Sequence, residues 1–144
     1  MLPFRPAEPG VKLSDVETPA LIIDMNAFEQ NLLTMEKALA GSNARLRGHA
    51  KAHKCSNVAL RQIQAGAVGI CCQKVSEAAV MVAGGVKNVL VTNQIVAPSK
   101  LARLCALAKD AEIAVLCDDA AAVTVLSKAA RSFAQNRYCG GIVA

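Results

Sequence analysis

The sequence is poor in aromatic residues, with no Trp, 1 Tyr and 3 Phe among its 144 residues. Its hydrophobic core must therefore be built from Ala, Val, Leu and Ile. The scarcity of aromatics also argues against a protein that binds RNA or single-stranded DNA by stacking against the bases.

Several other features are absent or rare. The 9 Gly and 5 Pro are too few for a collagen-like or low-complexity chain. No run approaches the roughly 18 apolar residues of a membrane-spanning helix, and the first residues lack the basic and then apolar pattern of a secretory signal. The hydrophobic share of 53% and the net charge of +5 exclude intrinsic disorder. We therefore expect one globular domain that does not contact membranes.

The 6 cysteines do not have the spacing of a disulfide framework or of a metal site. They contain no C-x-x-C pair, and two of them are adjacent. Most lie in apolar runs, where cysteine packs as a small hydrophobe. We therefore predict reduced, buried thiols and, in the absence of a secretory signal, a cytoplasmic protein. The cysteines are Cys55, Cys71, Cys72, Cys105, Cys117 and Cys139.

Beyond an irregular arm at residues 1–16, short apolar runs alternate with segments of helical periodicity. We expect strands at residues 19–24, 44–50, 67–72, 88–92 and 112–117. We expect helices to begin at the typical start residues Asn26, Ser56, Ser76, Pro98 and Asp119. Five alternations of this kind, with nearly all-apolar strands, predict a parallel α/β sheet that is covered on both faces.

Two architectures fit such an alternation, a doubly wound open sheet and a (β/α) barrel. The first strand-to-helix turn lacks the G-x-G-x-x-G pattern, so nothing in the sequence favours a dinucleotide-binding fold. A complete barrel typically needs about 250 residues. A chain of 144 residues supplies about half of one.

A cluster of basic residues lies between positions 45 and 54. It fits a solvated basic face, a nucleic-acid patch or a site for a phosphate-bearing small molecule. Alternate residues of a strand share a face, so five of the six side chains would point the same way. The cluster consists of Arg45, Arg47, His49, Lys51, His53 and Lys54.

This alternation places Lys51 at the carboxyl end of a parallel strand. Barrel enzymes collect their catalytic groups at that end of the strands. Neighbouring cations also favour the neutral amine that Schiff-base chemistry requires. From the spacing alone, however, a solvated charge run is the simpler interpretation.

Four segments occur in an order and at spacings that resemble a known enzyme family. They are residues 18–24 (TPALIID), 47–54 (RGHAKAHK), 69–77 (GICCQKVSE) and 89–93 (VLVTN). Together they resemble the N-terminal part of the D-threonine aldolase family, whose relatives include 3-hydroxy-D-aspartate aldolase and D-serine dehydratase. All of these are similar to the alanine racemase N-terminal domain of the fold-type III pyridoxal phosphate enzymes. The resemblance covers about residues 17–132.

The resemblance implies a fold and a division of the chain. The fold is a partial (β/α) TIM-type barrel, about the first half of one, preceded by an N-terminal strand and helix. The division is an irregular arm at residues 1–16, an incomplete barrel domain at 17–133 and a divergent tail at 134–144.

The resemblance also implies a set of site residues. Lys51 would form the aldimine with pyridoxal phosphate, and Lys54 would be a second, non-covalent lysine. Gln73 would approach the cofactor, with His49 and His53 as near neighbours.

The implied reaction is the retro-aldol cleavage of a β-hydroxy-D-amino acid to glycine and an aldehyde, with dehydration of such a substrate as the alternative. Full-length relatives are expected to be homodimers that use a divalent metal, whose ligands lie in a C-terminal β-domain without a counterpart in this sequence. No nucleic-acid or membrane partner is implied. A non-catalytic fragment or partner subunit is the competing interpretation, and we expect the chain alone to lack turnover.

Overall fold

The computed structural model describes residues 7–136 and 142–143, and within these residues strands and helices alternate. A short 3-10 helix, Leu13–Asp15, lies in the N-terminal arm. The helices are α1 (Met25–Leu39), α2 (Ser56–Gln64), α3 (Val75–Ala83), α4 (Pro98–Leu107) and α5 (Ala120–Asn136). The strands are β1 (Gly48–His49), β2 (Ile70–Cys72), β3 (Asn88–Gln94), β4 (Glu112–Leu116) and β5 (Ile142–Val143).

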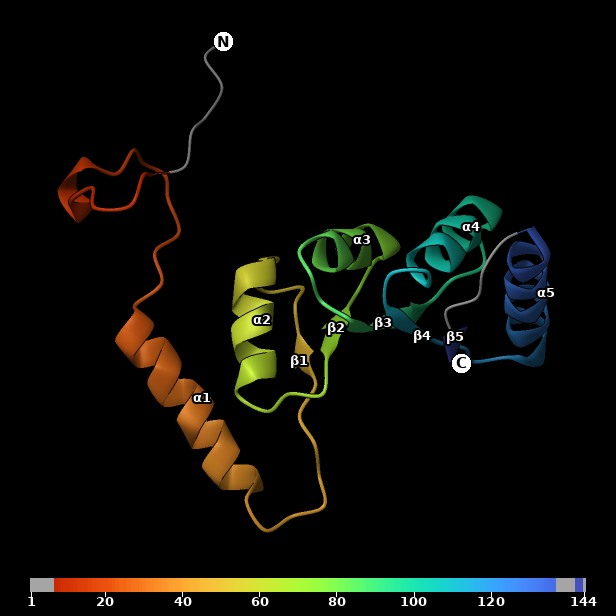
Figure 1. The fold of residues 1–144 in the computed structure, drawn as a ribbon, viewed down its shortest axis with the longest axis horizontal. Helices are drawn as coiled ribbons and strands as arrows, with labels where there is room; N and C mark the ends of the chain where they lie inside the picture. The colour runs from red at the N-terminus through yellow and green to blue at the C-terminus, as the bar shows by residue number, and fades with distance from the viewer. Residues whose placement is uncertain (1–6, 137–141, 144) are drawn as a thin grey trace.

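All five strands are parallel and follow one another in the order β1-β2-β3-β4-β5. Figure 1 shows α2 to α5 in a row along one side of this sheet. Right-handed crossovers that always advance to the next strand place every helix on the same face. A doubly wound sheet would instead reverse its strand order and carry helices on both faces. The architecture is therefore the open arc of a (β/α) barrel, which confirms the predicted fold class.

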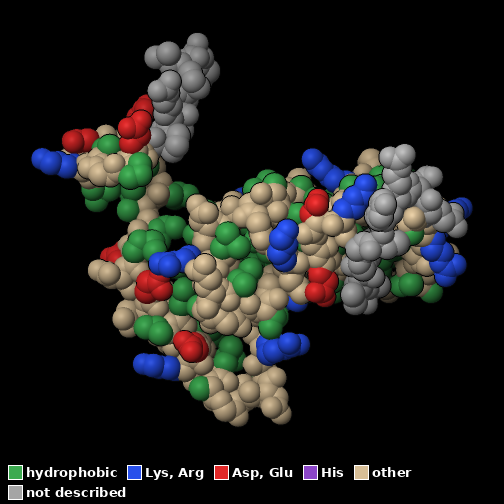
Figure 2. All heavy atoms as spheres, viewed as in Figure 1, with side chains coloured by type: hydrophobic (Ala, Val, Ile, Leu, Met, Phe, Trp, Pro, Cys, Tyr) green, Lys and Arg blue, Asp and Glu red, His purple; other side chains and the backbone are tan. Residues whose placement is uncertain are grey.

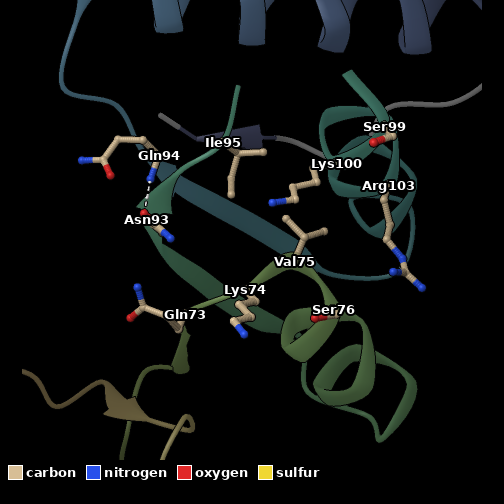
Figure 3. Close-up of a pocket in the computed structure, with 10 residues that line it drawn as sticks. All are labelled: Gln73, Lys74, Val75, Ser76, Asn93, Gln94, Ile95, Ser99, Lys100 and Arg103. Carbon is tan, nitrogen blue, oxygen red and sulfur yellow. Dashed lines mark hydrogen bonds between the residues drawn. The ribbon is translucent and has the colours of Figure 1, made fainter. Parts of the chain in front are cut away.

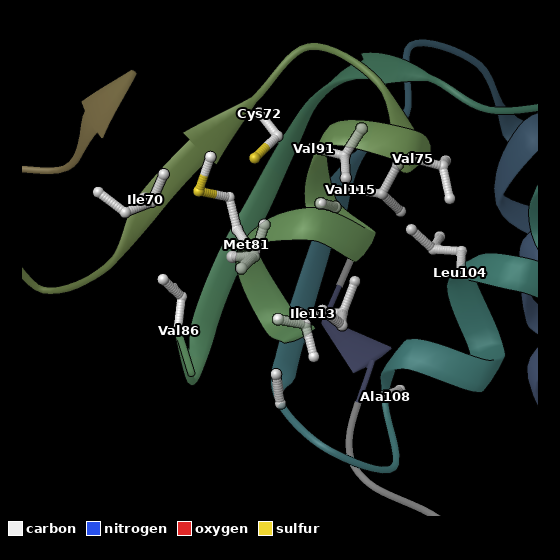
Figure 4. Packing of buried hydrophobic residues seen from close by; sticks show 14 of the residues in the cluster. Ile70, Cys72, Val75, Met81, Val86, Val91, Leu104, Ala108, Ile113 and Val115 are labelled. Atoms are coloured by element: carbon white, nitrogen blue, oxygen red, sulfur yellow. The ribbon is translucent and has the colours of Figure 1, made fainter. Parts of the chain in front are cut away.

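The hydrophobic core lies between the sheet and the helices, as the close-up of α3 and α4 shows (Figure 4). On β3, Val89 and Val91 are fully buried, and Ile113 and Val115 of β4 are buried beside them. The alternate residue Leu90 lies on the other face of the sheet and is only half-buried. The expectation that both faces would be covered is wrong for the described residues, because α2 to α5 all pack on one face.

The described cysteines are free thiols, as predicted. Burial raises the pKa of the Cys72 thiol to about 12, and the charge of Glu77 and the neighbouring Cys71 add to the effect. Cys139 lies outside the described residues. The buried thiols are Cys71, Cys72 and Cys105, and the half-buried ones are Cys55 and Cys117.

The helices begin close to the predicted positions, although three of the predicted capping residues do not cap. Ser56 is the first residue of α2, which follows the N-cap residue Cys55 and has no side-chain capping bond. Asp24 caps α1 in place of Asn26, and its carboxylate accepts a bond of 3.0 Å from the main-chain amide three residues on. At the start of α3 the carboxylate of Glu77, rather than Ser76, accepts bonds from main-chain amides. Asp119 caps α5 as predicted. No helix in the described part of the chain is long and apolar enough to cross a membrane.

The strand predicted at residues 19–24 is not found. This segment bends at Pro19, is otherwise irregular, and pairs with none of the described strands. Its apolar side chains are exposed, with Leu21 at 100% and Ile22 at 58%. Figure 2 shows the hydrophobic side chains that lie at the surface in this region, near the N-terminal end of the chain. A short apolar run favours a strand, but only a partner strand can satisfy its backbone hydrogen bonds.

Two further strand boundaries differ from the sequence prediction. The strand expected at residues 44–50 is limited to Gly48–His49, because only these residues pair with β2. The strand β5 was not predicted, since its two residues lie in the segment taken as a divergent tail. It extends the sheet beyond β4.

Candidate functional site

Polar side chains gather where β1, β2 and β3 end. His49 is the last residue of β1, Gln73 follows β2 directly, and β3 carries Thr92 and Asn93 near its end. All four side chains are half-buried. Since the strands are parallel, their carboxyl ends form one edge of the sheet. This is the edge at which (β/α) barrels carry their functional groups.

Lys51 lies in a turn immediately beyond β1. The turn is closed by a hydrogen bond of 2.7 Å from the Lys54 amide to the Ala50 carbonyl oxygen. Ala50 is buried in the core and anchors the turn, whereas the Lys51 side chain is exposed. Strand alternation therefore ends at His49, and the predicted common face of the basic cluster does not extend to its last members.

His49 connects the lysine turn to the middle of the sheet. Its Nε2 atom lies 3.0 Å from the hydroxyl oxygen of Thr92 on β3. Its Nδ1 atom accepts a hydrogen bond of 3.2 Å from the main-chain amide of Lys51. The structure thus brings His49, Lys51 and Thr92 together. Thr92 was missed as a site residue, although its position near the end of a predicted strand was a signal.

His53 lies apart from this group. Its Nδ1 atom accepts a bond of 3.1 Å from the Cys55 amide, and its ring lies near Gln62 on α2. Burial lowers the pKa of His53 below the usual 6.5. The Nε2 atom is buried and has no partner among the described residues. His53 lies apart from His49 because the turn at Lys51 directs it toward α2.

The two lysines of the cluster have different surroundings. Lys54 lies 3.9 Å from the carboxylate of Glu77. The same carboxylate accepts a bond of 2.9 Å from the Gln73 amide and thereby fixes the chain at the end of β2. Lys51 forms no ion pair within residues 7–136 and 142–143. Lys51 is thus the lysine whose amine is left available.

A cavity of about 360 Å³ lies between the ends of β2 and β3 and the first turns of α3 and α4. Gln73 and Asn93 line it on the strand side (Figure 3). Lys74, Lys100 and Arg103 line it on the helix side, and no carboxylate is among its lining residues. A cavity with this lining attracts anionic groups such as phosphates and carboxylates.

Arg47 belongs to the opposite end of the sheet. Its guanidinium donates a hydrogen bond to the side-chain oxygen of Asn88. The side-chain nitrogen of Asn88 in turn donates a hydrogen bond of 2.8 Å to the Glu112 carboxylate. These residues lie at the amino ends of the strands. Arg47 shares a sheet face with His49, as alternation predicts, but it does not take part in the site. In the described part of the chain no three His, Cys, Asp or Glu side chains are grouped as a metal site.

Residues 23–138 match the family described as the alanine racemase N-terminal domain. The chain belongs to this family. As an alanine racemase N-terminal domain, it is 48% identical over 124 residues to a D-threonine aldolase from Arthrobacter sp., a match that covers 86% of this chain and 33% of the relative. It is 42% identical over 128 residues to 3-hydroxy-D-aspartate aldolase from Paracoccus denitrificans, covering 88% of this chain and 33% of the relative.

A solved structure gives the same result for the fold. The crystal structure of D-threonine aldolase from Filomicrobium marinum superimposes on this alanine racemase N-terminal domain with a TM-score of 0.85 and 50% sequence identity. The match covers 90% of this chain and 35% of that one. The chain therefore spans about a third of the length of these relatives.

Proposed function

We propose that this chain supplies the cofactor lysine and neighbouring groups of a pyridoxal phosphate-dependent lyase that acts on β-hydroxy-D-amino acids. The proposed reaction breaks the Cα–Cβ bond of the substrate and releases glycine and an aldehyde. The observation that carries the proposal is the setting of Lys51, whose exposed amine lies beyond the carboxyl end of β1, free of an ion pair with any described carboxylate. The names of the aldolase relatives support the choice of substrate class.

The side chains at this edge fit pyridoxal phosphate. An aldehyde requires a primary amine that can lose its proton, and Lys51 offers one that no described carboxylate holds. Lys74, Lys100 and Arg103 on the same edge of the sheet suit the anionic groups of the cofactor and the substrate. When bound, the cofactor supplies an electron-withdrawing ring that accepts the electron pair released in the reaction.

The other residues of the site position either the ligand or the turn that carries Lys51. Gln73 is held at the end of β2 by the bond from its amide to Glu77, so its side-chain amide can orient a ligand at this edge. Glu77 also lies beside Lys54, which leaves Lys54 less free to react than Lys51. His53, half-buried beside α2, supports the turn and does not contact a ligand. These roles divide the basic cluster into one reacting lysine and its supports.

The proposal is tested by finding which lysine binds the cofactor. The protein is incubated with pyridoxal phosphate, reduced with borohydride and mapped by peptide mass spectrometry. We expect a pyridoxyl group on Lys51 and its loss in Lys51→Ala, while the exposed Lys128 of α5 provides a matched control in Lys128→Ala. This measurement requires no turnover. An adduct on Lys54, or labelling spread evenly over exposed lysines, would overturn the assignment.

The reaction type is tested by identifying the products formed by a full-length protein that contains this chain, since we expect the chain alone to lack turnover. Glycine and acetaldehyde formed from D-threonine are the products expected of aldol cleavage. Ammonia and a 2-oxo acid would instead identify the dehydration that the resemblance leaves as the alternative. That result would retain Lys51 as the cofactor lysine and refute the aldolase assignment.

A further inference from the structure

We infer that Thr92 and His49 form a positioning pair that fixes the main chain at Lys51, and that His49 is held as the neutral tautomer protonated at Nε2. The importance of this pair for catalysis rests on the proposed role of Lys51. The hydrogen bonds that define the pair involve only described residues and do not depend on that role.

The proton on the His49 ring is located by the partner of Nδ1. The main-chain amide of Lys51 points at this atom from 3.2 Å. An amide N–H can only donate a hydrogen bond, so Nδ1 must accept it with its lone pair. In a neutral imidazole the proton is then on Nε2.

The Thr92 hydroxyl fits this tautomer. Its proton is engaged with the Cys72 carbonyl oxygen at 3.2 Å, and a carbonyl oxygen can only accept. The hydroxyl oxygen therefore presents a lone pair toward His49 Nε2, 3.0 Å away. The opposite tautomer would place two lone pairs against each other at Thr92 and two N–H groups against each other at Lys51. Only the Nε2–H form satisfies all three bonds.

The result is a chain of hydrogen bonds that crosses the sheet. It runs from the Cys72 carbonyl on β2 through Thr92 on β3 and His49 on β1 to the amide of Lys51. Lys51 needs such support because β1 is only two residues long and ends directly before the turn. Both ring nitrogens of His49 are occupied, so this histidine has no free lone pair with which to act as a base. It is therefore a positioning residue.

His53 provides an internal comparison. Its Nδ1 atom accepts from the Cys55 amide two residues ahead, which repeats the pattern at His49. Its Nε2 atom, however, has no hydrogen-bond partner among the described residues. A change at Thr92 should therefore alter the ring of His49 and leave that of His53 as it is.

The test is nitrogen NMR of the imidazole rings, which is simple here because the protein has only 2 histidines. The two rings are assigned with His53→Asn. In the cofactor-free protein we expect a protonated Nε2 and an unprotonated Nδ1 on His49. Thr92→Val keeps the side-chain shape but removes the acceptor of the Nε2–H group, and we expect the Nε2 resonance of His49 to shift while the Lys51 amide still keeps the proton off Nδ1. Thr92→Ser should restore the original Nε2 resonance.

Thr124→Val is the matched control, because the Thr124 hydroxyl donates to the Ala120 carbonyl oxygen of its own helix on the exposed side of α5. An Nδ1–H tautomer at His49 in the unmodified protein would overturn the inference, as would a Thr92→Val spectrum identical to it. The first of these outcomes is read in the unmodified protein, with His53→Asn used only for the assignment, so misfolding of a Thr92 variant does not protect the inference.

A second measurement connects the pair to Lys51. We expect Thr92→Val to weaken pyridoxal phosphate binding at Lys51 about fivefold, the effect of losing one hydrogen bond, and Thr92→Ser to recover it. Equal binding by the two variants would refute the positioning role. A cofactor adduct on Lys54 would instead refute the proposed function and leave the tautomer result standing, so the two failures are distinguishable.

Discussion

Replacing Gly69 by Ala should destabilise the protein more than the same change at the nearby Gly48. A Cβ atom at Gly69 would lie 2.5 Å from the Asn88 carbonyl oxygen and 2.5 Å from the Arg47 guanidinium. The carbonyl belongs to β3, which pairs with β2 directly beyond Gly69, so it cannot move away without disturbing the sheet. Gly69 is thus the gap through which Arg47 reaches across β2 to Asn88.

The expected cost combines two effects. Overpacking against a fixed backbone typically costs about 1–3 kcal/mol. Displacing Arg47 also breaks its bond to Asn88, and since Arg47 is only half-buried, water recovers part of that loss. We expect Gly69→Ala to lower the free energy of unfolding by about 3 kcal/mol. This is a large share of the roughly 5–15 kcal/mol of a typical domain and corresponds to a decrease in Tm of about 10 °C.

Gly48→Ala is the matched control on the neighbouring strand. A Cβ atom there would meet only the end of the Gln62 side chain, at 2.9 Å, and that side chain can rotate away. We expect it to cost less than about 1 kcal/mol. Urea unfolding followed by circular dichroism measures both variants. If the two differ by less than about 0.5 kcal/mol, the reasoning from backbone contact is refuted.

Two further predictions follow from the perturbed pKa values. Burial lowers the pKa of His53 below 6.5, so the unfolded chain takes up a proton at higher pH than the folded one, and the free energy of unfolding should fall as pH drops below 6.5. Urea titrations at a series of pH values should show a weaker fall in His53→Asn. Equal dependence of the unfolding free energy on pH in the two proteins would contradict this. Because the Cys72 pKa is about 12, iodoacetamide at pH 8 should label the half-buried Cys117 long before Cys72; equal labelling rates in the folded protein would contradict the burial argument.

Local chemistry was enough to predict the order of helices and strands. Hydrophobic periodicity placed α2 to α5 within a few residues, and Asp119 caps α5 as expected. Pro98 opens α4 because its missing N–H is not needed at the first position of a helix. Such features depend on neighbours in the sequence, so the sequence contains them. The motif around Lys51 that resembles the aldolase family could likewise be recognised from the sequence.

Pairing between strands could not be predicted in the same way. The apolar run at residues 19–24 resembles a strand but has no partner among the described residues, whereas Ile142–Val143 forms one beside β4. A strand is completed by hydrogen bonds to a distant segment, and hydrophobicity does not specify that segment. The helices on a single face likewise follow from strand order, which periodicity alone leaves open.

The basic cluster shows where the sequence alone stops being informative about the site. The sequence by itself determined that Lys51 follows a strand and that His49 and Arg47 share a face. Only the tertiary structure decided that the strand ends at His49 and that His53 turns toward α2. It also decided that His49 meets Thr92, 43 positions away in the chain. Alternation describes side chains only while the strand persists, and where it ends depends on the hydrogen bonds that the neighbouring strand supplies.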